Sequence, residues 1–422
     1  MLTASRPRFG VRDSGFDTDA DRIERPGSRI PVPGSLIPDS GSPIADPASR
    51  IPNPGTWVDV ISDYDQFVGL EDEWNDAVER ARIPHPFLRH EWVRTWWDSF
   101  GASRQVSRKL HIVIVREQDR IVGIAPLMRE SAVSYGLPIR RIALAANDHT
   151  PRTDFIVAGS EDAVYRAIWN SLASQIDCWD VLQLTQLPRT SRTIPAISRL
   201  ASDEQLPIGT WTSSDSPYLE LAGTWDTYWA TLSAKFRSNV RNRLARLKSI
   251  GEPALDILSD NTAIATALDD VWRLEASGWK DKEGTSIAAD AAVQKFYTLL
   301  AQRGAERGWL RLLFLTAGGK RIAVSYSAVH DGRLFLLKTG HDREFHTCSP
   351  FKLLTYFAAQ AAYARQLKEI DFLGETEPWK QEWTSAARAH DWLFVFSNSR
   401  RARLLHSIKF QMAPEIKKKW RA

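Results

Sequence analysis

The most basic segment of the chain carries the first candidate chemistry. Residues 235–248, KFRSNVRNRLARLK, hold six cationic side chains and no acidic one. Arginine outnumbers lysine here, and a guanidinium can bind a phosphate or a carboxylate through two hydrogen bonds. We therefore expect an anion-binding segment, with Arg237 and Arg241 as substrate-binding residues. The alternative is a solvated helix face, although such faces usually mix lysine with glutamate.

The spacing of the apolar residues predicts that this segment is an amphipathic helix. Its apolar side chains recur every three or four residues, at Phe236, Val240, Leu244 and Leu247. The cations flank this stripe in two rows. The first margin holds Arg237, Arg241 and Lys248, and the second margin holds Lys235, Arg243 and Arg246. The helix should dock through its stripe and hold both margins close to the rest of the protein.

A second segment, residues 346–366, has the pattern of a helix that begins at a hydroxyl and a proline. Ser349 suits the N-cap position, and Pro350 suits the first helical position. The free amide groups and the dipole at a helix N-terminus attract anions. Lys352 adds a positive charge in the first turn. The sequence therefore predicts an anion site at this helix end.

Residues 369–383, EIDFLGETEPWKQEW, place a carboxylate inside an apolar strand. Such a carboxylate must be hydrogen-bonded or face a cleft, because an unpaired buried charge is costly. We predict a cleft in which Asp371 accepts a proton or orients a nucleophile while Lys380 neutralises charge on the substrate. The other residues expected to contact the substrate there are Glu375, Trp379 and Trp383. The alternative is a turn-capping aspartate among surface charges.

Two other clusters give weaker signals. His341, His346 and Cys348 match no closed zinc set in their spacing, so we predict no metal site. Residues 147–155, NDHTPRTDF, combine acidic and basic side chains, and we expect an ion-paired loop. The sequence contains no nucleophile elbow, zinc-protease motif or Walker loop.

The composition limits the class of protein. A chain of 422 residues fits two domains and a tail, and its net charge of +4 makes the basic segment a local feature. No apolar run reaches the roughly 20 residues that cross a bilayer. The N-terminus lacks a signal-peptide layout, and the two cysteines lie far apart. We therefore expect a cytoplasmic protein without a membrane span.

Hydrophobic periodicity predicts two similar mixed α/β halves, each built on antiparallel hairpins with helices to one side. In the first half, strands are expected at 57–61, 140–146, 153–159, 180–187 and 216–221, a hairpin at 110–130, and helices at 64–81, 90–100 and 161–176. In the second half, helices are expected at 224–250, 262–278, 288–307 and 350–366, a hairpin at 310–340, and a strand at 369–373.

These elements divide the chain into four parts. Residues 1–55 repeat SRIPVPG as SRIPNPG, and their density of proline and glycine predicts disorder. We assign residues 56–222 to an N-terminal domain and residues 223–398 to a C-terminal domain. Residues 399–422 are expected to form a basic C-terminal tail.

Five stretches together resemble a known family. They are WATLSAKFRSNVRNRLARL, GWLRLLFLTAGGKRIAVSYS, RLFLLKTGHDREF, CSPFKLLTY and EIDFLGETEPWKQEW. They are similar to the CelD-like acetyltransferases of the GNAT superfamily, bacterial proteins often associated with cellulose or exopolysaccharide production. That family is related to the FemAB aminoacyltransferases, which also pair two GNAT-like halves. The resemblance covers residues 57–398, is strongest from residue 224, and implies two tandem GNAT-like domains.

The resemblance also implies a site. In GNAT enzymes an acyl-CoA lies where two strands of the sheet splay apart, and main-chain amides of one strand, here LFLLKTG, polarise the thioester carbonyl. The pyrophosphate would rest on the helix start. The implied cofactor-binding residues are Ser349, Pro350, Phe351, Lys352 and Lys338, and Tyr326 and His341 join the substrate site. An amine or hydroxyl of the acceptor would attack, with Asp371 as the base.

The chain departs from the family pattern at that helix start. GNAT enzymes usually carry a Gln/Arg-x-x-Gly-x-Gly/Ala loop there, whereas this chain has HTCSPFK, with Phe351 where CelD-like proteins tend to have glycine. Three functions therefore stay open. The first, which we favour, is an acyltransferase that uses acetyl-CoA or another acyl-CoA on a small molecule or sugar. The others are a FemAB-like aminoacyltransferase that uses tRNA, and a catalytically silent anion-binding protein of a polysaccharide assembly.

Overall fold

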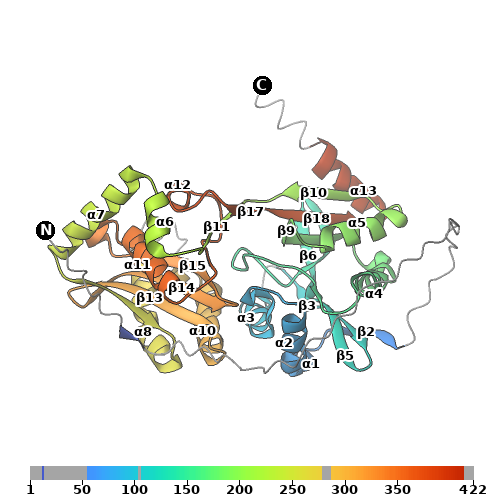
Figure 1. Ribbon diagram of the computed structural model, residues 1–422. Helices are drawn as coiled ribbons and strands as arrows, with labels where there is room; N and C mark the ends of the chain where they lie inside the picture. The colour runs from blue at the N-terminus through green and yellow to red at the C-terminus, as the bar shows by residue number, and fades with distance from the viewer. Residues whose placement is uncertain (1–11, 14–54, 103–105, 278–286, 413–422) are drawn as a thin grey trace, which may run out of the picture.

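The computed structural model describes residues 12–13, 55–102, 106–277 and 287–412. They form two mixed α/β halves that lie side by side (Figure 1). This arrangement confirms the fold class expected from the sequence. The segment predicted to be disordered lies outside the described residues, except for Gly55 and for Arg12–Asp13. The latter two form β1, which pairs with a strand of the C-terminal half.

The N-terminal half contains two antiparallel-rich sheets and the helices that cover them. Its strands are β2 (Thr56–Ile61), β3 (Arg108–Leu110), β4 (Ile112–Glu117), β5 (Arg120–Ala125), β6 (Leu127–Ser134), β7 (Leu137–Leu144), β8 (Ile156–Val157), β9 (Val181–Pro188) and β10 (Ile208–Thr212). Its helices are α1 (Tyr64–Gly69), α2 (Glu71–Arg80), η1 (Pro86–Leu88), α3 (His90–Phe100), α4 (Glu161–Ala173), η2 (Ile176–Cys178) and α5 (Thr193–Asp203). The predicted hairpin corresponds to β4 and β5, which turn through Gln118 and Asp119 at positive φ.

The C-terminal half is built around one large sheet. Its strands are β11 (Ser216–Glu220), β12 (Pro253–Leu258), β13 (Leu310–Ala317), β14 (Lys320–His330), β15 (Arg333–His341), β16 (Glu369–Asp371) and β17 (Ala387–Arg388), and the strand that follows them in the chain, β18 (His390–Phe396), joins a sheet of the N-terminal half. Its helices are α6 (Trp225–Thr231), α7 (Ala234–Lys248), α8 (Asn261–Ala276), η3 (Ile287–Ala289), α10 (Ala291–Glu306), η4 (Arg343–Cys348), α11 (Pro350–Ala364), α12 (Pro378–Gln381), α13 (Arg400–His406) and η5 (Ser407–Met412).

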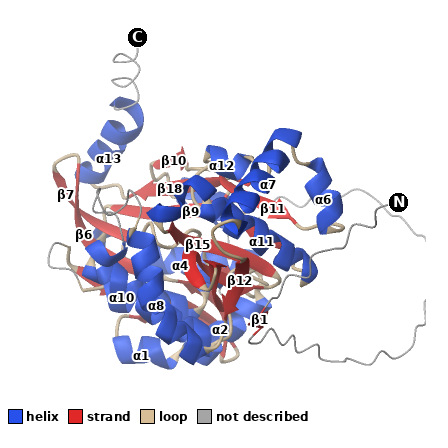
Figure 2. Ribbon diagram, turned by 90° about the vertical axis from the view of Figure 1, so that its left-hand side faces the viewer, coloured by secondary structure: helices blue, strands red, loops and turns tan. Residues whose placement is uncertain are grey.

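Helices cover both faces of this sheet, whose order is β1-β12-β13-β14-β15-β16-β11-β17 (Figure 1). Along β13, Leu312 and Phe314 pack toward α8 and α10, whereas Leu313 and Leu315 pack toward α7 and α11. Every residue of β13 is buried, as expected for a strand covered on both faces. Figure 2 shows α8 and α10 close together on one face of the sheet.

The two halves exchange strands. β11 precedes the predicted domain boundary, yet it pairs with β16 in the C-terminal sheet. β18 follows that sheet in the chain, yet it lies between β9 and β10 of the N-terminal half. A division of the chain after residue 222 therefore leaves one strand on each side hydrogen-bonded to the other half, and the domain limits stay a proposal.

One hydrophobic core crosses the boundary between the halves. Trp92 of α3 packs against Phe296 of α10 and Trp309, with ring centroids 5.8 and 6.1 Å apart. Trp309 also donates its indole N–H to the buried carboxylate of Glu91, at 3.0 Å. Several of the tryptophans thus form the contact between the halves.

Three predicted segments differ in detail from the structure. The expected helix 224–250 is interrupted, because Leu232 is extended and Ser233 caps a new helix through its bond to the Phe236 amide (3.2 Å). The expected helix 64–81 likewise divides at Leu70 into α1 and α2. Residues 400–412, assigned to the tail, form α13 and η5, where Leu405 is buried.

Candidate acyl-transfer site

Two parallel strands separate in the middle of the C-terminal sheet. β15 and β16 pair at three positions, from Arg333 opposite Glu369 to Phe335 opposite Asp371. β16 then ends, whereas β15 continues to His341. Residues 334–336 of β15 are buried, and the residues beyond them are half-buried. The outer part of β15 therefore has an edge that β16 does not cover.

A β-bulge lies at the point where this edge begins. Ser327 of β14 faces Leu336, and the next residue back, Tyr326, faces Lys338. Leu337 thus stands opposite no residue of β14. A bulge leaves its extra residue outside the ladder and turns the strand locally. The ladder between β14 and β15 is therefore interrupted at Leu337, beside the part of β15 that β16 does not cover.

β15 leads through η4 into the N-terminus of α11. Ser349 has a left-handed backbone (φ 49°, ψ 62°), and its hydroxyl makes no capping hydrogen bond. Pro350 is buried at the first helical position, as predicted from the sequence. The first-turn amides of a helix have no partner inside the helix, so this uncapped end can accept an anion.

The basic helix α7 packs beside this end through its second margin. Phe236, Val240 and Leu247 are buried, so α7 docks through the predicted stripe. Arg243 and Arg246 both donate to the main-chain oxygen of Thr347, which lies in η4 just before α11. Two guanidinium groups therefore stand at the predicted anion site.

The first margin lies on the other side of the apolar stripe of α7. Arg241 is exposed, and the Nε of Arg237 is buried without a hydrogen-bond partner. The structure thus brings Arg243 and Arg246, which were not predicted to bind a ligand, to the start of α11, and a substrate-binding role for Arg237 and Arg241 stays a prediction. The spacing of the residues predicted both margins, but it did not indicate which margin contacts η4.

The segment after β16 folds against α11 and α7 through aromatic contacts. The Phe351 ring packs edge-on against Trp379, at 4.9 Å between centroids, and Trp379 packs against Phe372 at 5.8 Å. Trp383 is 2% exposed and meets Phe236 at 4.9 Å. Phe351, Trp379 and Trp383, all predicted to bind ligands, thus belong to one packed layer that joins these elements.

A cavity of about 410 Å³ lies at the N-terminal end of α7. Lys235 and Asn239 line it from the helix, and Trp383 lines it from the segment after α12. Lys352 ion-pairs with Glu382 at 2.6 Å, and Glu382 also lines this cavity. The Lys352 ammonium lies 5.2 Å from the centre of the Phe236 ring. The charge that Lys352 offers an anion at the α11 start is therefore partly compensated.

Asp371 lies in a buried ion-pair network at the seam between the halves. Its side chain is fully buried, and one carboxylate oxygen accepts from Arg152 at 2.5 Å and from Arg388 at 2.8 Å. The other oxygen accepts from the Leu373 amide at 3.0 Å and from the Ser216 hydroxyl at 3.4 Å. Both oxygens are thus engaged, and Arg152 comes from the N-terminal half.

Lys380 closes the turn that follows Asp371. Its ammonium donates to the main-chain oxygens of Leu373 (2.7 Å) and Glu375 (2.8 Å) and ion-pairs with Glu377 at 3.1 Å. Leu373 has a positive φ of 55°, a conformation unfavourable for a bulky residue. Asp371 accepts from the main-chain amide of Leu373, and Lys380 donates to its main-chain oxygen, so the two side chains together stabilise this turn. The Glu375 carboxylate is exposed and accepts from Ser214 at 3.2 Å.

Lys338 and Tyr326 lie on the face of the sheet that meets the N-terminal half. Tyr326 is fully buried and donates its hydroxyl to the Tyr297 main-chain oxygen at 2.9 Å. The Lys338 ammonium lies 5.5 Å from the centre of the Tyr297 ring, and the Tyr297 hydroxyl is 3.3 Å from Nδ1 of His149. His341, at the end of β15, is half-buried.

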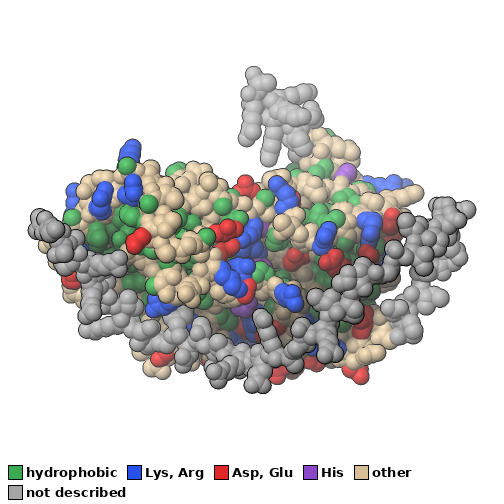
Figure 3. All heavy atoms as spheres, in the orientation of Figure 1, with side chains coloured by type: hydrophobic (Ala, Val, Ile, Leu, Met, Phe, Trp, Pro, Cys, Tyr) green, Lys and Arg blue, Asp and Glu red, His purple; other side chains and the backbone are tan. Residues whose placement is uncertain are grey.

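Residues 147–155, expected to be an ion-paired loop, lie along this seam. His149 stacks on Phe100 at 5.7 Å, and Arg152 donates both to Asp371 and to Nε2 of His390, the latter at 3.2 Å. In the sequence, only the mixture of acidic and basic side chains in this loop indicated that it forms ion pairs. Figure 3 shows charged side chains of both signs gathered between the two halves.

Burial keeps the seam histidines neutral. It lowers the pKa of His149 to about 4, with a smaller contribution from the Lys338 charge. It also lowers the pKa of His390 to about 4, assisted by the Arg152 charge. A neutral His390 can accept the hydrogen bond from Arg152, and His149 is unprotonated near pH 7.

Two further findings concern the described residues as a whole. None of their helices combines the length and the apolar character needed to cross a bilayer. Among the same residues, the His, Cys, Asp and Glu side chains form no group of three or more that could hold a metal ion.

Comparisons with known proteins agree with this geometry. Residues 234–381 match the acetyltransferase (GNAT) domain family, a region that contains β12–β16, α7 and α11. No curated protein matches the chain.

Among solved structures, FemX has a TM-score of 0.54 at 10% identity, over 79% of this chain and 98% of that one. A conserved protein of unknown function from Bacteroides thetaiotaomicron has a TM-score of 0.50 at 9% identity, over 81% and 100%. A tandem GNAT protein from the clavulanic acid biosynthesis pathway has a TM-score of 0.40 at 15% identity, over 82% and 99%.

The likeness to FemX and to the Bacteroides protein extends over both halves, so it concerns the fold of nearly the whole described chain. Acyl-CoA is the co-substrate that GNAT domains generally use. Residues 234–381 thus match the acetyltransferase (GNAT) domain family, and the rest of the chain lies outside that match.

Proposed function

We propose that the protein is an acyltransferase that moves an acyl group from acyl-CoA to an amine or hydroxyl of a small molecule or sugar. The observation that carries this proposal is the separation of β15 from β16 together with the bulge at Leu337. This edge offers main-chain amides to a carbonyl oxygen, and it leads directly to an uncapped helix end. A role in exopolysaccharide production is not included, since no reported relative carries one.

The residues present fit an acyl-CoA. Acyl-CoA supplies a thioester whose carbonyl carbon an amine or hydroxyl can attack. The amides at the start of α11, with Arg243 and Arg246, would hold the pyrophosphate, while Ser349 and Pro350 set the direction of those amides. The amides of β15 beyond Leu336 would bind the carbonyl oxygen. Phe351 would hold α11 against the segment after β16.

The acceptor would bind on the face of the C-terminal sheet that meets the N-terminal half, beside β15. Asp371 would hold the halves in position, since both of its oxygens already accept hydrogen bonds. His149 is neutral and lies close to Lys338 through Tyr297, so we assign the proton acceptor to it. Lys338 would bind a negative group of the acceptor or donor.

Thermal unfolding with ligands tests the donor. A ligand present at about 100 times its Kd stabilises a protein by about 2.7 kcal/mol, so acetyl-CoA and desulfo-CoA should both raise Tm measurably. Only acetyl-CoA should release free thiol when amines are added. A protein that ignores both compounds, yet binds aminoacyl-tRNA with a steep dependence on salt, would instead be the FemAB-like enzyme.

The two margins of α7 provide a matched pair of variants. Arg243→Ala with Arg246→Ala should raise the Kd for acetyl-CoA at least tenfold, because two charge-assisted contacts to the pyrophosphate would be lost. Arg237→Ala with Arg241→Ala removes the same charge from the same helix and should change that Kd less than threefold. Isothermal titration measures both. If Arg237→Ala with Arg241→Ala raised the Kd for acetyl-CoA more than Arg243→Ala with Arg246→Ala, the first margin would be the one that binds the pyrophosphate.

His149→Phe separates catalysis from packing. Phenylalanine keeps the stacking on Phe100 but removes the ring nitrogens. General-base catalysis contributes roughly 10²–10⁴-fold, so kcat should fall about 100-fold while KM for acetyl-CoA stays constant. His406→Phe, at a histidine of α13 that likewise stacks on a phenylalanine, Phe410, is the control. An unchanged kcat in His149→Phe, with Tm also unchanged, would remove His149 from the mechanism.

A further inference from the structure

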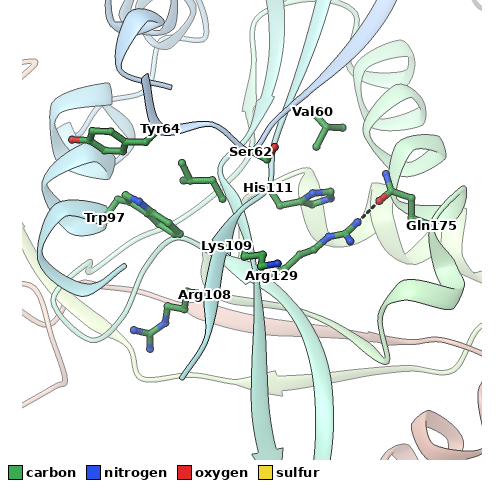
Figure 4. Close-up of a pocket in the computed structure, with 10 residues that line it drawn as sticks. Val60, Ser62, Tyr64, Trp97, Arg108, Lys109, His111, Arg129 and Gln175 are labelled. Carbon is green, nitrogen blue, oxygen red and sulfur yellow. Dashed lines mark hydrogen bonds between the residues drawn. The ribbon is translucent and has the colours of Figure 1, made fainter. Parts of the chain in front are cut away.

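A second cavity lies in the N-terminal half, apart from the strands and helix end described above. It measures about 600 Å³ and lies between β3 and β6 on one side and α1 and α3 on the other (Figure 4). Its polar walls are positively charged, with Arg108, Lys109 and Arg129, and none of its lining residues is acidic. The cavity volume is in the range of sites for small organic ligands.

Two of these cations directly face each other. Lys109 of β3 stands opposite Arg129 of β6 in the antiparallel ladder. Like charges at facing positions destabilise a sheet unless a counter-charge lies between them. Lys109 is exposed and Arg129 is half-buried, so an anion could reach both. The pair is placed as a cationic clamp at the mouth of the cavity.

Buried polar atoms without partners line the same cavity. His111 is 4% exposed, and its Nε2 has no hydrogen-bond partner. The Nε of Arg129 is likewise buried without a partner, although another nitrogen of this guanidinium donates to Gln175. Figure 4 shows the His111 ring directed toward the same part of the cavity as the Arg129 guanidinium. Buried polar groups normally have partners, so these two atoms are available to a ligand that enters the cavity.

Glu130 and Asp98 are next in sequence to the lining residues Arg129 and Trp97, and both carboxylates are already engaged. Glu130 is buried and ion-pairs with Arg108 and Arg141. Asp98 accepts from the Tyr64 hydroxyl at 2.6 Å and from Arg303 at 2.6 Å. Neither carboxylate is free to neutralise Lys109 or Arg129. Arg108 is itself satisfied by Glu130 and by the Phe100 main-chain oxygen, so Lys109 and Arg129 remain the cations for a ligand.

The opposite wall of the cavity is aromatic. Trp97 of α3 and Tyr64 of α1 line it, and Figure 4 shows both rings on the side away from Arg129. An indole face binds flat rings by stacking. A ligand with an anionic group near Lys109 and a ring near Trp97 would use both walls.

We propose that this cavity binds a small aromatic anion, whose phosphate or carboxylate group is held by Lys109, Arg129 and His111 and whose ring packs on Trp97. This site belongs to the N-terminal half and does not depend on the acyl-CoA site. Phosphate and carboxylate share the chemistry that these donors recognise, and the choice of probes below separates them.

Four probes measured by isothermal titration test the proposal on the full chain. Phenyl phosphate and benzoate carry the same ring on different anions, inorganic phosphate lacks the ring, and benzyl alcohol lacks the charge. We expect phenyl phosphate or benzoate to bind with a Kd below 1 mM, and at least tenfold more tightly than inorganic phosphate and benzyl alcohol. Equal binding of benzyl alcohol, or no binding of either aromatic anion, would overturn the proposal.

Variants locate the binding within the protein. Lys109→Ala changes an exposed side chain, and it should weaken the aromatic anion at least fivefold without lowering Tm. His111→Gln should also weaken it, with Trp97→Ala removing the preference for the ring. Arg120→Ala removes an equally positive, exposed side chain elsewhere in this half and is the control. If Arg120→Ala weakens binding as much as Lys109→Ala does, the anion is held by general charge, and the proposed site is wrong.

Discussion

Replacing Asp371 by asparagine should lower the free energy of unfolding by about 3–5 kcal/mol, the typical cost of removing one partner from a buried ion pair. The Arg152 side chain is 5% exposed, so its charge would remain buried without its carboxylate. Asparagine keeps the size of the side chain and can still accept from the Leu373 amide, so the change removes mainly charge. Urea unfolding measures the loss, provided that the m-value stays constant.

The control for this prediction is Glu375→Gln in the same segment. The Glu375 carboxylate is exposed and accepts from Ser214, so its replacement should change stability by less than about 0.5 kcal/mol. Adding Arg152→Gln to Asp371→Asn should recover part of the lost stability, because the buried unpaired charge disappears. An Asp371→Asn protein that is as stable as the wild type, yet inactive, would restore Asp371 as the proton acceptor.

Local patterns in the sequence were sufficient for most of the elements. The apolar stripe of α7, the Ser349-Pro350 start of α11 and the hairpin turn at Gln118 and Asp119 each depend on residues a few positions apart. Such signals survive in any tertiary context that buries the same face. The interruption at Ser233 could also have been predicted from the sequence. Serine is a favourable N-cap residue, and its hydroxyl accepts a hydrogen bond from the Phe236 amide at the start of α7.

The seam could not be predicted in the same way. Arg152 and Asp371 are 219 residues apart, and no periodicity links them. The exchange of β11 and β18 depends on which sheet edge each strand meets. The sequence marked Asp371 as a buried polar residue, which was sufficient to find the site but not its partners. The structure adds the partners Arg152, Arg388 and Ser216 to Asp371, and its role as the base stays a prediction.

Acidification should destabilise the protein between pH 6.5 and pH 4. Burial lowers the pKa of His111 and of His390 to about 4, and both side chains are almost fully buried. In this window the unfolded chain binds protons that the folded protein does not, so the free energy of unfolding falls as pH falls. Each histidine contributes up to about 3 kcal/mol, since one pKa unit corresponds to about 1.4 kcal/mol.

Asp154 acts in the opposite direction. Burial raises its pKa to about 6, so the folded protein gains a proton there before the unfolded chain does and recovers some stability as pH falls toward 4. The histidines have the larger combined effect on the free energy of unfolding, since burial also lowers the pKa of His85, His90 and His330. The net change with acid is therefore a loss. Asp154→Asn should make that loss steeper.

His390→Gln tests where the acid sensitivity arises. Glutamine can accept the hydrogen bond from Arg152 but cannot be protonated, so the slope of unfolding free energy against pH between 6 and 4.5 should decrease by up to about 1.4 kcal/mol per pH unit. His346→Gln, at an exposed position, should leave the slope unchanged. Because Arg152 bridges His390 and Asp371, protonation of His390 repels the guanidinium that holds the two halves together. A slope that is the same in His390→Gln as in the wild type would mean that the seam does not respond to acid, and that the loss of stability comes from histidines elsewhere in the core.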